Sequence, residues 1–433
     1  MRFSADVADM ASWPALEGRC MIDLNKIASL LNQRRPGCGL PRDLYTDPEA
    51  FEFDMAAIFG RSWIMVGFEF ELARPGAWMS TTVGPWPVVI TRDRHGDLHA
   101  FHNVCRHRGA RICPPGKGAS PRLVCPYHRW TYELWGDLAH AARMPAGFSR
   151  DDHGLTPVHL ANVGGALYVC VADTPPDIGA FKREFEPLLA PHRLGEAKVA
   201  FENVLVEKAN WKLAMENARE CYHCPTAHPE LAQSFPVQAT AHFDFGEDRR
   251  QEMFAARMAS LDLPIGPVEG EWWQAVRFTL NEGFRSMTMD GQPVVKIPMC
   301  ARGEGDIGSL RWSIEPHGFA HAAADHLFMF SAVPVSPRET HIVSKWVVHK
   351  DAVEGVDYKI EDLKALWDRT NLQDRDLVEN NQAGVDSPAF RPGPFSEEAE
   401  SLATRFLDWY CRTAQAYVDE QGASSKRLAH GLD

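Results

Sequence analysis

Two short motifs, each pairing one cysteine with one histidine, constrain this chain more than any other feature. Cys105-Arg106-His107 is followed, after seventeen intervening residues, by Cys125-Pro126-Tyr127-His128. The four side chains can hold one tetrahedral zinc ion, or a [2Fe–2S] cluster with two thiolates on one iron and two imidazoles on the other. Zinc fingers pair Cys with Cys and His with His, whereas here each motif supplies one of each. This order favours the cluster, with zinc as the alternative.

A second set of metal-ligand side chains lies in the stretch ENARECYHCPTAHPE. Glu220 and His223 are three residues apart, so a helix would place them side by side. His223 and His228 are five apart, and one straight helix would separate them. Pro225 disfavours helix at Cys224 and allows the chain to fold His228 back. Two such histidines and one distant carboxylate make up a non-haem Fe(II) site.

Composition excludes several classes of function. The chain has 433 residues, with 45 Lys and Arg against 58 Asp and Glu, a net charge of −13. This charge disfavours nucleic acid, an anionic membrane or another polyanionic partner. We find no export signal and no run of about 18 apolar residues, so we expect no membrane span. The ten cysteines are scattered, and we therefore expect a cytoplasmic protein whose cysteines are free or metal-bound.

The hydrophobic pattern predicts an α+β fold. A helix is expected from residue 47, followed by short strands at 63–66, 88–91 and 166–171 in a small antiparallel β-domain. Further strands are expected at 198–206, 310–314, 326–333 and 341–348, and the first of them leads into a helix that carries Glu220. Two C-terminal helices are expected at 357–380 and 397–418, the second with Ser396 as its N-cap.

The first pair of motifs resembles the Rieske family, in which the pattern is CxH…CPYHxW. Arg108-Gly109 and Trp130 agree with the family in the flanking positions. Ala110 and Tyr127 occupy the positions of the disulfide cysteines of high-potential Rieske proteins, so the oxygenase-type domains are the more similar. The resemblance implies a segment at 1–44 that packs with the catalytic domain and a Rieske domain at 45–175. It also implies a helix-grip-like catalytic domain at 176–433 with an antiparallel sheet and mononuclear iron.

The stretch NWKLAMENARECYHCPTAHPE resembles the catalytic-helix motif of Rieske non-haem iron oxygenases. The family has an aspartate eight residues before a glutamine, which here selects Asp374 as the third iron ligand, with Asp376 and Asp368 as nearby competitors. Glu220 occupies the position where most ring-hydroxylating relatives have an aspartate that bridges a cluster histidine and an iron histidine of neighbouring subunits. The resemblance therefore implies the same catalytic role for Glu220 and a ring of subunits, most simply a homotrimer.

The source of electrons is expected to be a separate protein. Residues 303–308 spell GxGxxG, but they lead into a strand-like run rather than a helix, so we predict no nucleotide site there. The resemblance then implies a separate NAD(P)H-dependent flavin and iron–sulphur reductase.

The C-terminal stretch QDRDLVENNQAGVDSPAFRPGPFSEEAES resembles glycine betaine demethylases and, more loosely, choline, carnitine and proline-betaine monooxygenases. This similarity implies hydroxylation of an N-methyl group, converting glycine betaine to dimethylglycine and formaldehyde. An aromatic-ring dihydroxylase large subunit and a non-enzymatic electron carrier are the alternatives. A trimethylammonium group is recognised by aromatic faces. The candidate residues for such a cage are Trp272, Trp273, Phe278, Phe284, Trp312, Trp346 and Phe390.

Overall fold

The computed structural model describes residues 22–236 and 249–430, which form two compact units. The first unit comprises residues 59–178, and the second comprises the described residues before 59 and after 178. The division lies at residue 59 rather than at the expected residue 45, so α3 (Pro48–Ala57) belongs to the second unit. The reason is Asp54, which is buried in α3 and accepts hydrogen bonds from Trp211 (3.0 Å) and Tyr410 (2.7 Å) of the second unit.

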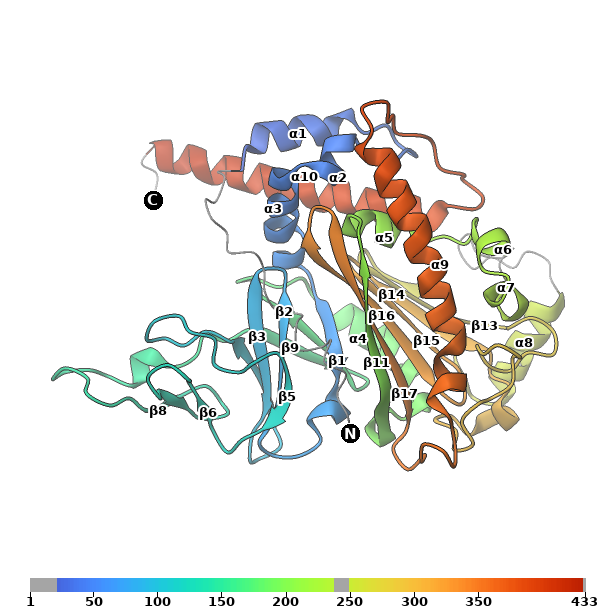
Figure 1. The fold of residues 1–433 in the computed structure, drawn as a ribbon, viewed down its shortest axis with the longest axis horizontal. Coiled ribbons are helices and arrows are strands. Elements are labelled where there is room, and N and C mark those ends of the chain that lie inside the picture. Colours follow the sequence, from blue (N-terminus) through green and yellow to red (C-terminus); the bar gives the residue numbers. More distant parts are fainter. Residues whose placement is uncertain (1–21, 237–248, 431–433) are drawn as a thin grey trace. The chain divides into compact units, whose positions relative to one another are not determined.

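The first unit consists of three antiparallel sheets, ordered β4-β3-β2-β5, β1-β10-β9 and β6-β7-β8 (Figure 1). Apolar strands such as β10, which is buried along its whole length, form its core. The strands are β1 (Ile64–Phe68), β2 (Ala77–Val83), β3 (Trp86–Arg92), β4 (Leu98–His102), β5 (Gly116–Ala119), β6 (Leu123–Val124), β7 (Thr131–Tyr132), β8 (Leu138–His140), β9 (His159–Val163) and β10 (Ala166–Cys170).

The second unit is built on one seven-stranded antiparallel sheet, ordered β11-β17-β16-β15-β14-β13-β12. Its strands are β11 (Ala197–Glu207), β12 (Val268–Glu269), β13 (Trp273–Phe278), β14 (Ser309–Ile314), β15 (Gly318–Ala322), β16 (Leu327–Ser336) and β17 (Glu339–His349). Its helices are α1 (Leu24–Gln33), α2 (Arg42–Thr46), α3, α4 (Gly179–Leu189), α5 (Trp211–Asn217), α6 (Cys224–Ala227), α7 (Leu231–Ser234), α8 (Arg249–Ser260), α9 (Ile360–Asp386) and α10 (Ser401–His430).

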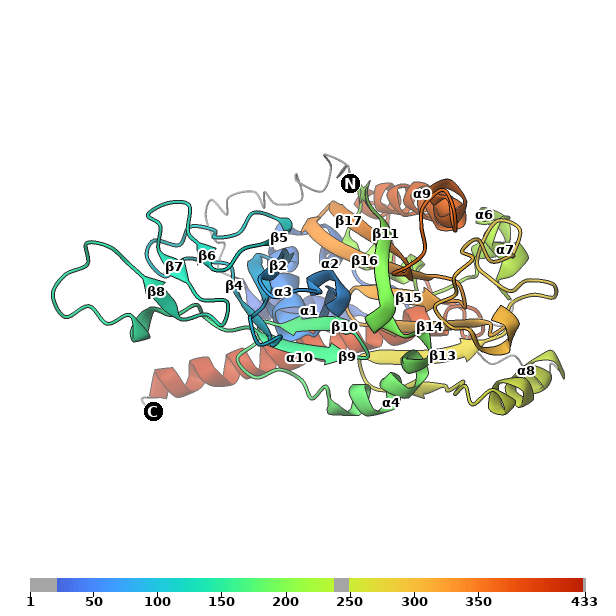
Figure 2. The same ribbon diagram turned by 90° about the horizontal axis from the view of Figure 1, so that it is seen from below.

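Helices α4 and α9 cover opposite faces of this sheet (Figure 2). On the α4 face, Phe185 lies 5.1 Å from Trp312 of β14, measured between ring centroids. On the α9 face, Trp367 stacks on Phe328 of β16 at 4.2 Å. Because successive side chains of a strand point to opposite faces, Arg311 lies on the α9 face although its neighbour Trp312 lies on the α4 face.

The sequence predictions for the fold are largely confirmed. The α+β class, the antiparallel sheets and both C-terminal helices are present. Ser396 does accept a hydrogen bond from Ala399 N–H (3.1 Å), but α10 begins only at Ser401, so the predicted helix start at 397 is wrong. In the part of the chain that the structure describes, every helix is too short or too polar to cross a membrane.

Candidate metal centres

The two Cys/His motifs of the first unit form loops with the same backbone geometry. The first loop joins β4 to β5, and the second joins β6 to β7. The carbonyl oxygen of each cysteine accepts a hydrogen bond from the residue four positions later, from Gly109 to Cys105 (2.9 Å) and from Arg129 to Cys125 (3.1 Å). That later residue is left-handed in both loops, with φ of 77° at Gly109 and 62° at Arg129. The two loops therefore present their cysteines in equivalent turns.

The two cysteine side chains of these loops are buried, whereas the two histidine side chains lie nearer the surface. Cys105 and Cys125 are only 3% and 1% exposed. His128 is exposed and His107 is partly exposed, and their ring centroids lie 4.7 Å apart. The hydroxyl of Tyr132 lies 3.3 Å from the Cys105 sulphur. Two buried thiols and two outer imidazoles fit a [2Fe–2S] cluster with its thiolate iron inside and its imidazole iron outside.

The second set of ligand-type residues lies in a turn rather than on a helix. Helix α5 ends at Asn217, so the prediction that a helix carries Glu220 is wrong. The Glu220 carboxylate still bonds the Nδ1 of His223, because the turn brings the two together. His223 is the N-cap of the short helix α6, in which Pro225 occupies the first turn, and the chain then bends so that His228 returns to His223. Proline favours this position because its missing N–H has no partner there in any helix.

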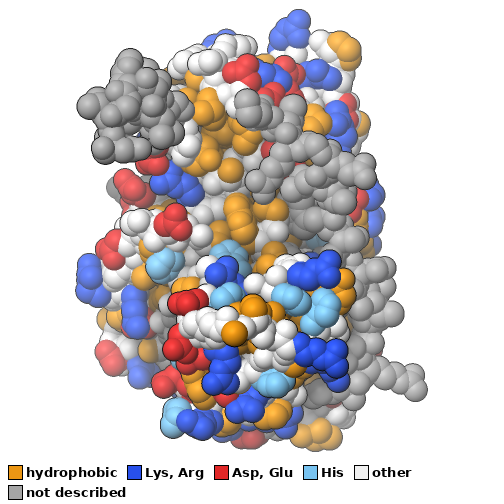
Figure 3. All heavy atoms as spheres, turned by 90° about the vertical axis from the view of Figure 1, so that its left-hand side faces the viewer, with side chains coloured by type: hydrophobic (Ala, Val, Ile, Leu, Met, Phe, Trp, Pro, Cys, Tyr) orange, Lys and Arg blue, Asp and Glu red, His pale blue; other side chains and the backbone are white. Residues whose placement is uncertain are grey.

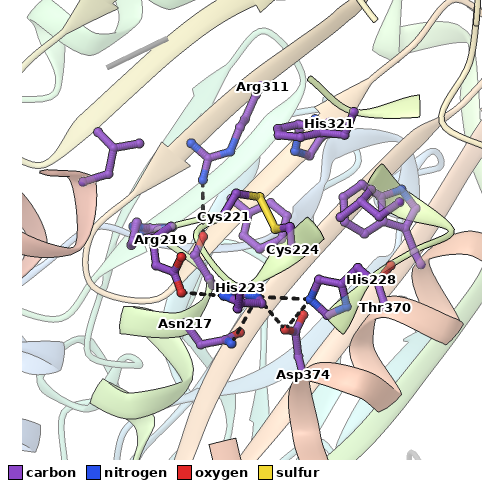
Figure 4. A pocket seen from close by; sticks show the side chains of 17 residues that line it. Asn217, Arg219, Cys221, His223, Cys224, His228, Arg311, His321, Thr370 and Asp374 are labelled. Carbon is purple, nitrogen blue, oxygen red and sulfur yellow. Dashed lines mark hydrogen bonds and ion pairs between the residues drawn. A yellow bond between two sulfur atoms is a disulfide. The ribbon is translucent and has the colours of Figure 1, made fainter. Parts of the chain in front are cut away.

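Three acceptor atoms from His223, His228 and Asp374 converge (Figure 4). The two Nε2 atoms are 3.1 Å apart. Oδ1 of Asp374, on α9, lies 2.9 Å from Nε2 of His228 and 3.3 Å from Nε2 of His223. Three ligands on one face of an octahedral metal, at about 2.1 Å from it, lie about 3.0 Å from one another. The spacing thus fits a metal ion with two histidines and one carboxylate.

The hydrogen bonds behind the imidazoles explain why a cation is needed here. Nδ1 of His228 lies 2.8 Å from Oε1 of Gln373, whose amide nitrogen donates to Glu230 (3.0 Å). Nδ1 of His223 faces the carboxylate of Glu220. Because both Nδ1 atoms face oxygen acceptors, each neutral ring carries its proton there, and the Nε2 lone pairs of the neutral rings then point at each other and at Asp374. These three electron-rich atoms repel one another unless a positive charge lies between them.

The pKa values of these groups reflect the same need. Burial lowers the pKa of His223, but the bonds to Asp374 and Glu220 outweigh it and raise this pKa to about 9. Burial also lowers the pKa of His228, and the bonds to Asp374 and Gln373 bring it above its ordinary value. Burial raises the pKa of Asp374, and both imidazoles reverse this and lower it. The group therefore holds positive charge strongly.

The two competing aspartates point elsewhere. The side chain of Asp376 is 70% exposed and pairs with Arg375, and Asp368 pairs with Lys364 of its own helix. The sulphur of Cys224 lies within 4.8 Å of both imidazole ligand atoms, but it forms a disulfide with Cys221. The prediction that the cysteines are free or metal-bound is therefore wrong for this pair, whose Cα atoms lie 4.8 Å apart in the turn.

A pocket adjoins the converging residues. None of the seven predicted cage residues lines it, and the aromatic side chains that do are Phe235, Phe319 and Trp367. Trp272, Trp273 and Trp312 lie on the α4 face of the sheet. A usable signal was the helical spacing of Trp367, Thr370 and Asp374, all of which line the pocket from one face of α9. The other lining residues that the sequence did not indicate are Asn217, Arg219, Leu231, Arg311, His321 and Leu402.

Comparison with known proteins identifies the class of protein that carries this arrangement. Residues 62–158 match the Rieske [2Fe-2S] domain family, and residues 194–416 match the ring hydroxylating alpha subunit (catalytic domain) family. The chain belongs to the Rieske non-haem iron oxygenases, and it is an oxygenase with a Rieske [2Fe–2S] cluster and a mononuclear iron.

Several of the similar proteins are named for the oxygenation of a quaternary ammonium compound. The chain is 39% identical to the glycine betaine monooxygenase oxygenase subunit of Chromohalobacter salexigens, over 96% of this chain and 95% of that protein. It is also 39% identical to the subunit of the same name from Pseudomonas aeruginosa, over 93% and 95%. The fold matches the quaternary ammonium Rieske monooxygenase CntA in complex with L-carnitine, with a TM-score of 0.66 at 21% identity over 89% of this chain and 97% of that one. The two relatives at 39% identity support a quaternary ammonium oxygenase, and the solved structure shows the same fold.

Proposed function

We propose that this protein is the terminal oxygenase that demethylates glycine betaine to dimethylglycine and formaldehyde. The proposal rests on one observation: three metal-ligand side chains, His223, His228 and Asp374, lie close together and line a pocket that also has aromatic walls. The naming of relatives at 39% identity supports the substrate. In the overall reaction, two electrons, two protons and O₂ are consumed, one oxygen atom enters an N-methyl C–H bond and the other leaves as water. The resulting carbinolamine then releases formaldehyde.

We assign the metal-binding residues from the geometry above. Cys105, His107, Cys125 and His128 hold the cluster, and His223, His228 and Asp374 hold the iron. When bound, the iron supplies the positions at which O₂ is activated, with electrons that pass through the cluster.

The surrounding side chains orient these ligands. Glu220 and Gln373 each bond the Nδ1 of one iron-site histidine, which fixes the ring and raises its basicity. Glu220 also has a second carboxylate oxygen, bonded to the backbone N–H of the exposed Tyr222. We propose that Glu220 accepts a further bond there from a cluster histidine of a neighbouring subunit, in a homotrimer.

A separate NAD(P)H-dependent flavin and iron–sulphur reductase is the proposed electron donor, acting with this oxygenase in the cytoplasm. The cluster loops suit a negatively charged donor, because residues 98–132 contain no Asp or Glu in a chain of net charge −13. Figure 3 shows histidine, lysine and arginine side chains gathered on the face that carries this region. The cations of the segment are Arg106, Arg108, Arg111, Lys117, Arg122 and Arg129, of which Lys117 pairs with Glu71 and Arg122 with Glu133.

Other substrates remain as alternatives within the same chemistry. Carnitine, choline and proline betaine share the quaternary ammonium group, and CntA, which has the same fold, has been solved with L-carnitine. An aromatic-ring dihydroxylase fits less well, because the relatives at 39% identity over most of the chain are named glycine betaine monooxygenase oxygenase subunits.

Formaldehyde release tests this proposal directly. The purified protein, a reductase, NADH and glycine betaine should yield formaldehyde and dimethylglycine in equal amounts. His223→Ala should yield neither while keeping the Rieske absorbance. A diol formed from naphthalene, with no formaldehyde from any betaine, would instead establish the dihydroxylase.

A further inference from the structure

Cys221 and Cys224 enclose one of the iron-site histidines in a small covalent ring. Their disulfide joins Cα atoms that lie 4.8 Å apart, and the two residues between them are Tyr222 and His223. Figure 4 shows the sulphur–sulphur bond beside His223, and both cysteines line the pocket. A change in this disulfide therefore acts directly on the backbone of His223.

The ring lies between two helices rather than within one. Helix α5 ends at Asn217, and the short helix α6 begins only at Cys224. Within the ring, the amide of Cys224 donates to the carbonyl of Cys221 at 3.2 Å. Breaking the disulfide therefore leaves a turn in which the side chain of Cys224 can rotate without unwinding a long helix.

The sulphur of Cys224 lies next to the ligand nitrogens. This sulphur and the ligand nitrogens of His223 and His228 all lie within 4.8 Å of one another. In a tetrahedral zinc site, sulphur and nitrogen ligands are about 3.6 Å apart, since Zn–S is about 2.3 Å and Zn–N about 2.1 Å. A change of staggered rotamer moves a cysteine sulphur by roughly 3 Å, which is more than this difference requires.

The oxidised and reduced forms of the pair offer different ligands to a metal. A cysteine binds metal as its thiolate, so the disulfide leaves the site with two histidines and Asp374. This set of three keeps positions open, as an iron oxygenase needs. The reduced form adds the thiolate of Cys224 as a fourth ligand. Four protein ligands that include sulphur suit a closed tetrahedral zinc site, with no position left for O₂.

We propose that Cys221 and Cys224 are a reversible redox pair that decides which metal occupies this site. As a disulfide, the pair leaves the open set of ligands that suits iron. As a dithiol, it supplies Cys224 as the fourth ligand of zinc and closes the site. This modification site goes beyond the proposed function and does not depend on which amine is oxidised. In a reducing compartment, such as the cytoplasm proposed for this protein, disulfides are usually transient and catalytic or redox-sensing.

The chemical step is an exchange of one S–S bond. A small dithiol attacks at Cys221, which is partly exposed, and releases Cys224, which is buried. Two cysteine S–H bonds form while the dithiol closes its own S–S bond, so two electrons and two protons pass to the pair. The thiol proton of Cys224 leaves to water when zinc binds. Hydrogen peroxide restores the disulfide by taking two electrons and two protons from the thiols, and it becomes two molecules of water.

Metal binding in the two redox states tests the proposal. The oxygenase keeps its cluster while a chelator removes the single iron, and Zn²⁺ or Fe²⁺ is titrated before and after reduction by a dithiol that is then removed. Reduction should tighten zinc binding about 100-fold and ferrous iron binding less than about tenfold. Because this coupling is reciprocal, saturating zinc should raise the reduction potential of the pair by about 60 mV, the same 100-fold factor for a two-electron couple. X-ray absorption at the zinc edge should show sulphur at about 2.3 Å in the reduced protein only.

Separate substitution of the two cysteines distinguishes a metal ligand from a structural cross-link. Cys221→Ser leaves Cys224 as a permanent thiol, and it should bind zinc in both conditions as tightly as the reduced wild type does. Cys224→Ser also lacks the disulfide, but it should keep the weaker zinc binding in both conditions. Cys411→Ser is the matched control, because Cys411 is a free cysteine of the same unit that does not line the pocket. It should respond to reduction as the wild type does.

Three results would overturn the redox pair. They are equal zinc binding before and after reduction, a zinc site without sulphur, and thiols that peroxide cannot convert to a disulfide, as judged by the loss of two hydrogen atoms from the intact mass. If Cys221→Ser does not fold, as judged by its Rieske absorbance, the wild type in its two redox states and Cys224→Ser still decide the question. A wild type that releases formaldehyde from no betaine would refute the proposed function, whereas redox-dependent zinc binding would still support the pair.

Discussion

In the first unit, all four metal-type residues come from two adjacent loops within residues 105–128, and both imidazoles reach the surface. In the second, His228 and Asp374 are separated by 146 positions, and His228 is 1% exposed. The segment 98–132 that carries the first region's loops contains cations and no acidic residue, whereas the second region gathers Glu220, Asp374 and Glu230 around its histidines. An open, positive region suits exchange of electrons with another protein. An enclosed, acidic one suits retention of a metal cation beside a substrate.

The largest effects should come from removing single ligands, because the two regions share none. Cys105→Ala should abolish the visible cluster absorbance, and the iron content should fall from about three to about one per chain. His228→Ala should keep the absorbance, lose the single iron and lower turnover at least about 1,000-fold. Iron analysis and visible spectra check both. Cys113→Ala in the same loop and Asp376→Asn on α9 are controls that should retain all the iron, and joint loss of both centres from one variant would refute their independence.

Glu220→Gln should separate the two centres functionally. The amide still accepts a bond from His223 but carries no charge, so both metals should bind while electron transfer between them slows about 100-fold. The rate at which the reduced cluster is reoxidised in a single turnover measures this effect. Glu398→Gln, an exposed glutamate of the same unit, should react at the wild-type rate. A full rate in Glu220→Gln would remove the proposed bridge.

The pH dependence of stability should arise in the second unit, where carboxyl groups are enclosed. Burial raises the pKa of Glu216 from 4.5 to about 7, against the opposing effects of Tyr45 and Lys212. The folded protein therefore keeps this proton between pH 4.5 and 7 while the unfolded chain loses it, so stability falls as pH rises through this window. Glu216→Gln cannot ionise, and its free energy of unfolding relative to wild type should improve by up to about 3 kcal/mol between pH 5 and 8. Urea unfolding at several pH values tests this, and a constant difference across that range would contradict the assignment.

A substitution at Gln373 tests how much the hydrogen bond to Nδ1 of His228 contributes to iron affinity. Gln373→Ala removes the acceptor at 2.8 Å from Nδ1 of His228 and should weaken iron binding about 10-fold to 100-fold. The measurement is iron retention during titration with a chelator, with the cluster absorbance as an internal reference. Arg375→Gln alters a side chain on the same helix that pairs with exposed Asp376, so its iron affinity should match the wild type. Equal affinity in Gln373→Ala would show that His228 needs no orienting partner.

The contrast between the regions also explains what the sequence could predict. The cluster loops are local, so the spacing of Cys105, His107, Cys125 and His128 was enough to indicate them. The Glu220–His223 pair was expected for the wrong reason, since a turn rather than a helix brings the two together. Asp374 was selected by the family resemblance, although its helical spacing from Trp367 and Thr370 is a local signal that Asp376 does not share.

The pocket walls were the least predictable part. Strand alternation decides which residue faces the substrate, and an error of one position exchanges Arg311 for Trp312. The sequence shows that both belong to one strand, but which of them faces α9 depends on how α4 and α9 pack on the sheet. Whole-chain charge carries no local information either, because a net charge of −13 does not show that residues 98–132 contain no Asp or Glu.

The smallest effect should come from changing the charge of residues 98–132, the segment that carries the cluster loops. This change tests the difference in charge between the two regions. Arg106 and Arg129 are exposed and flank cluster ligands. Arg106→Glu/Arg129→Glu should raise the KM for the reductase about fivefold at low salt, because complementary charge mainly increases the rate of encounter. The difference should shrink as salt is raised, since about 0.15 M ions already screen exposed charges beyond about 8 Å. Arg285→Glu/Arg302→Glu makes the same change in net charge on the second unit, so a general effect of charge would slow both variants equally. Slower reduction only when the cluster loops are altered, with formaldehyde yield per electron unchanged, would establish that the reductase recognises the positive region rather than the protein's overall charge.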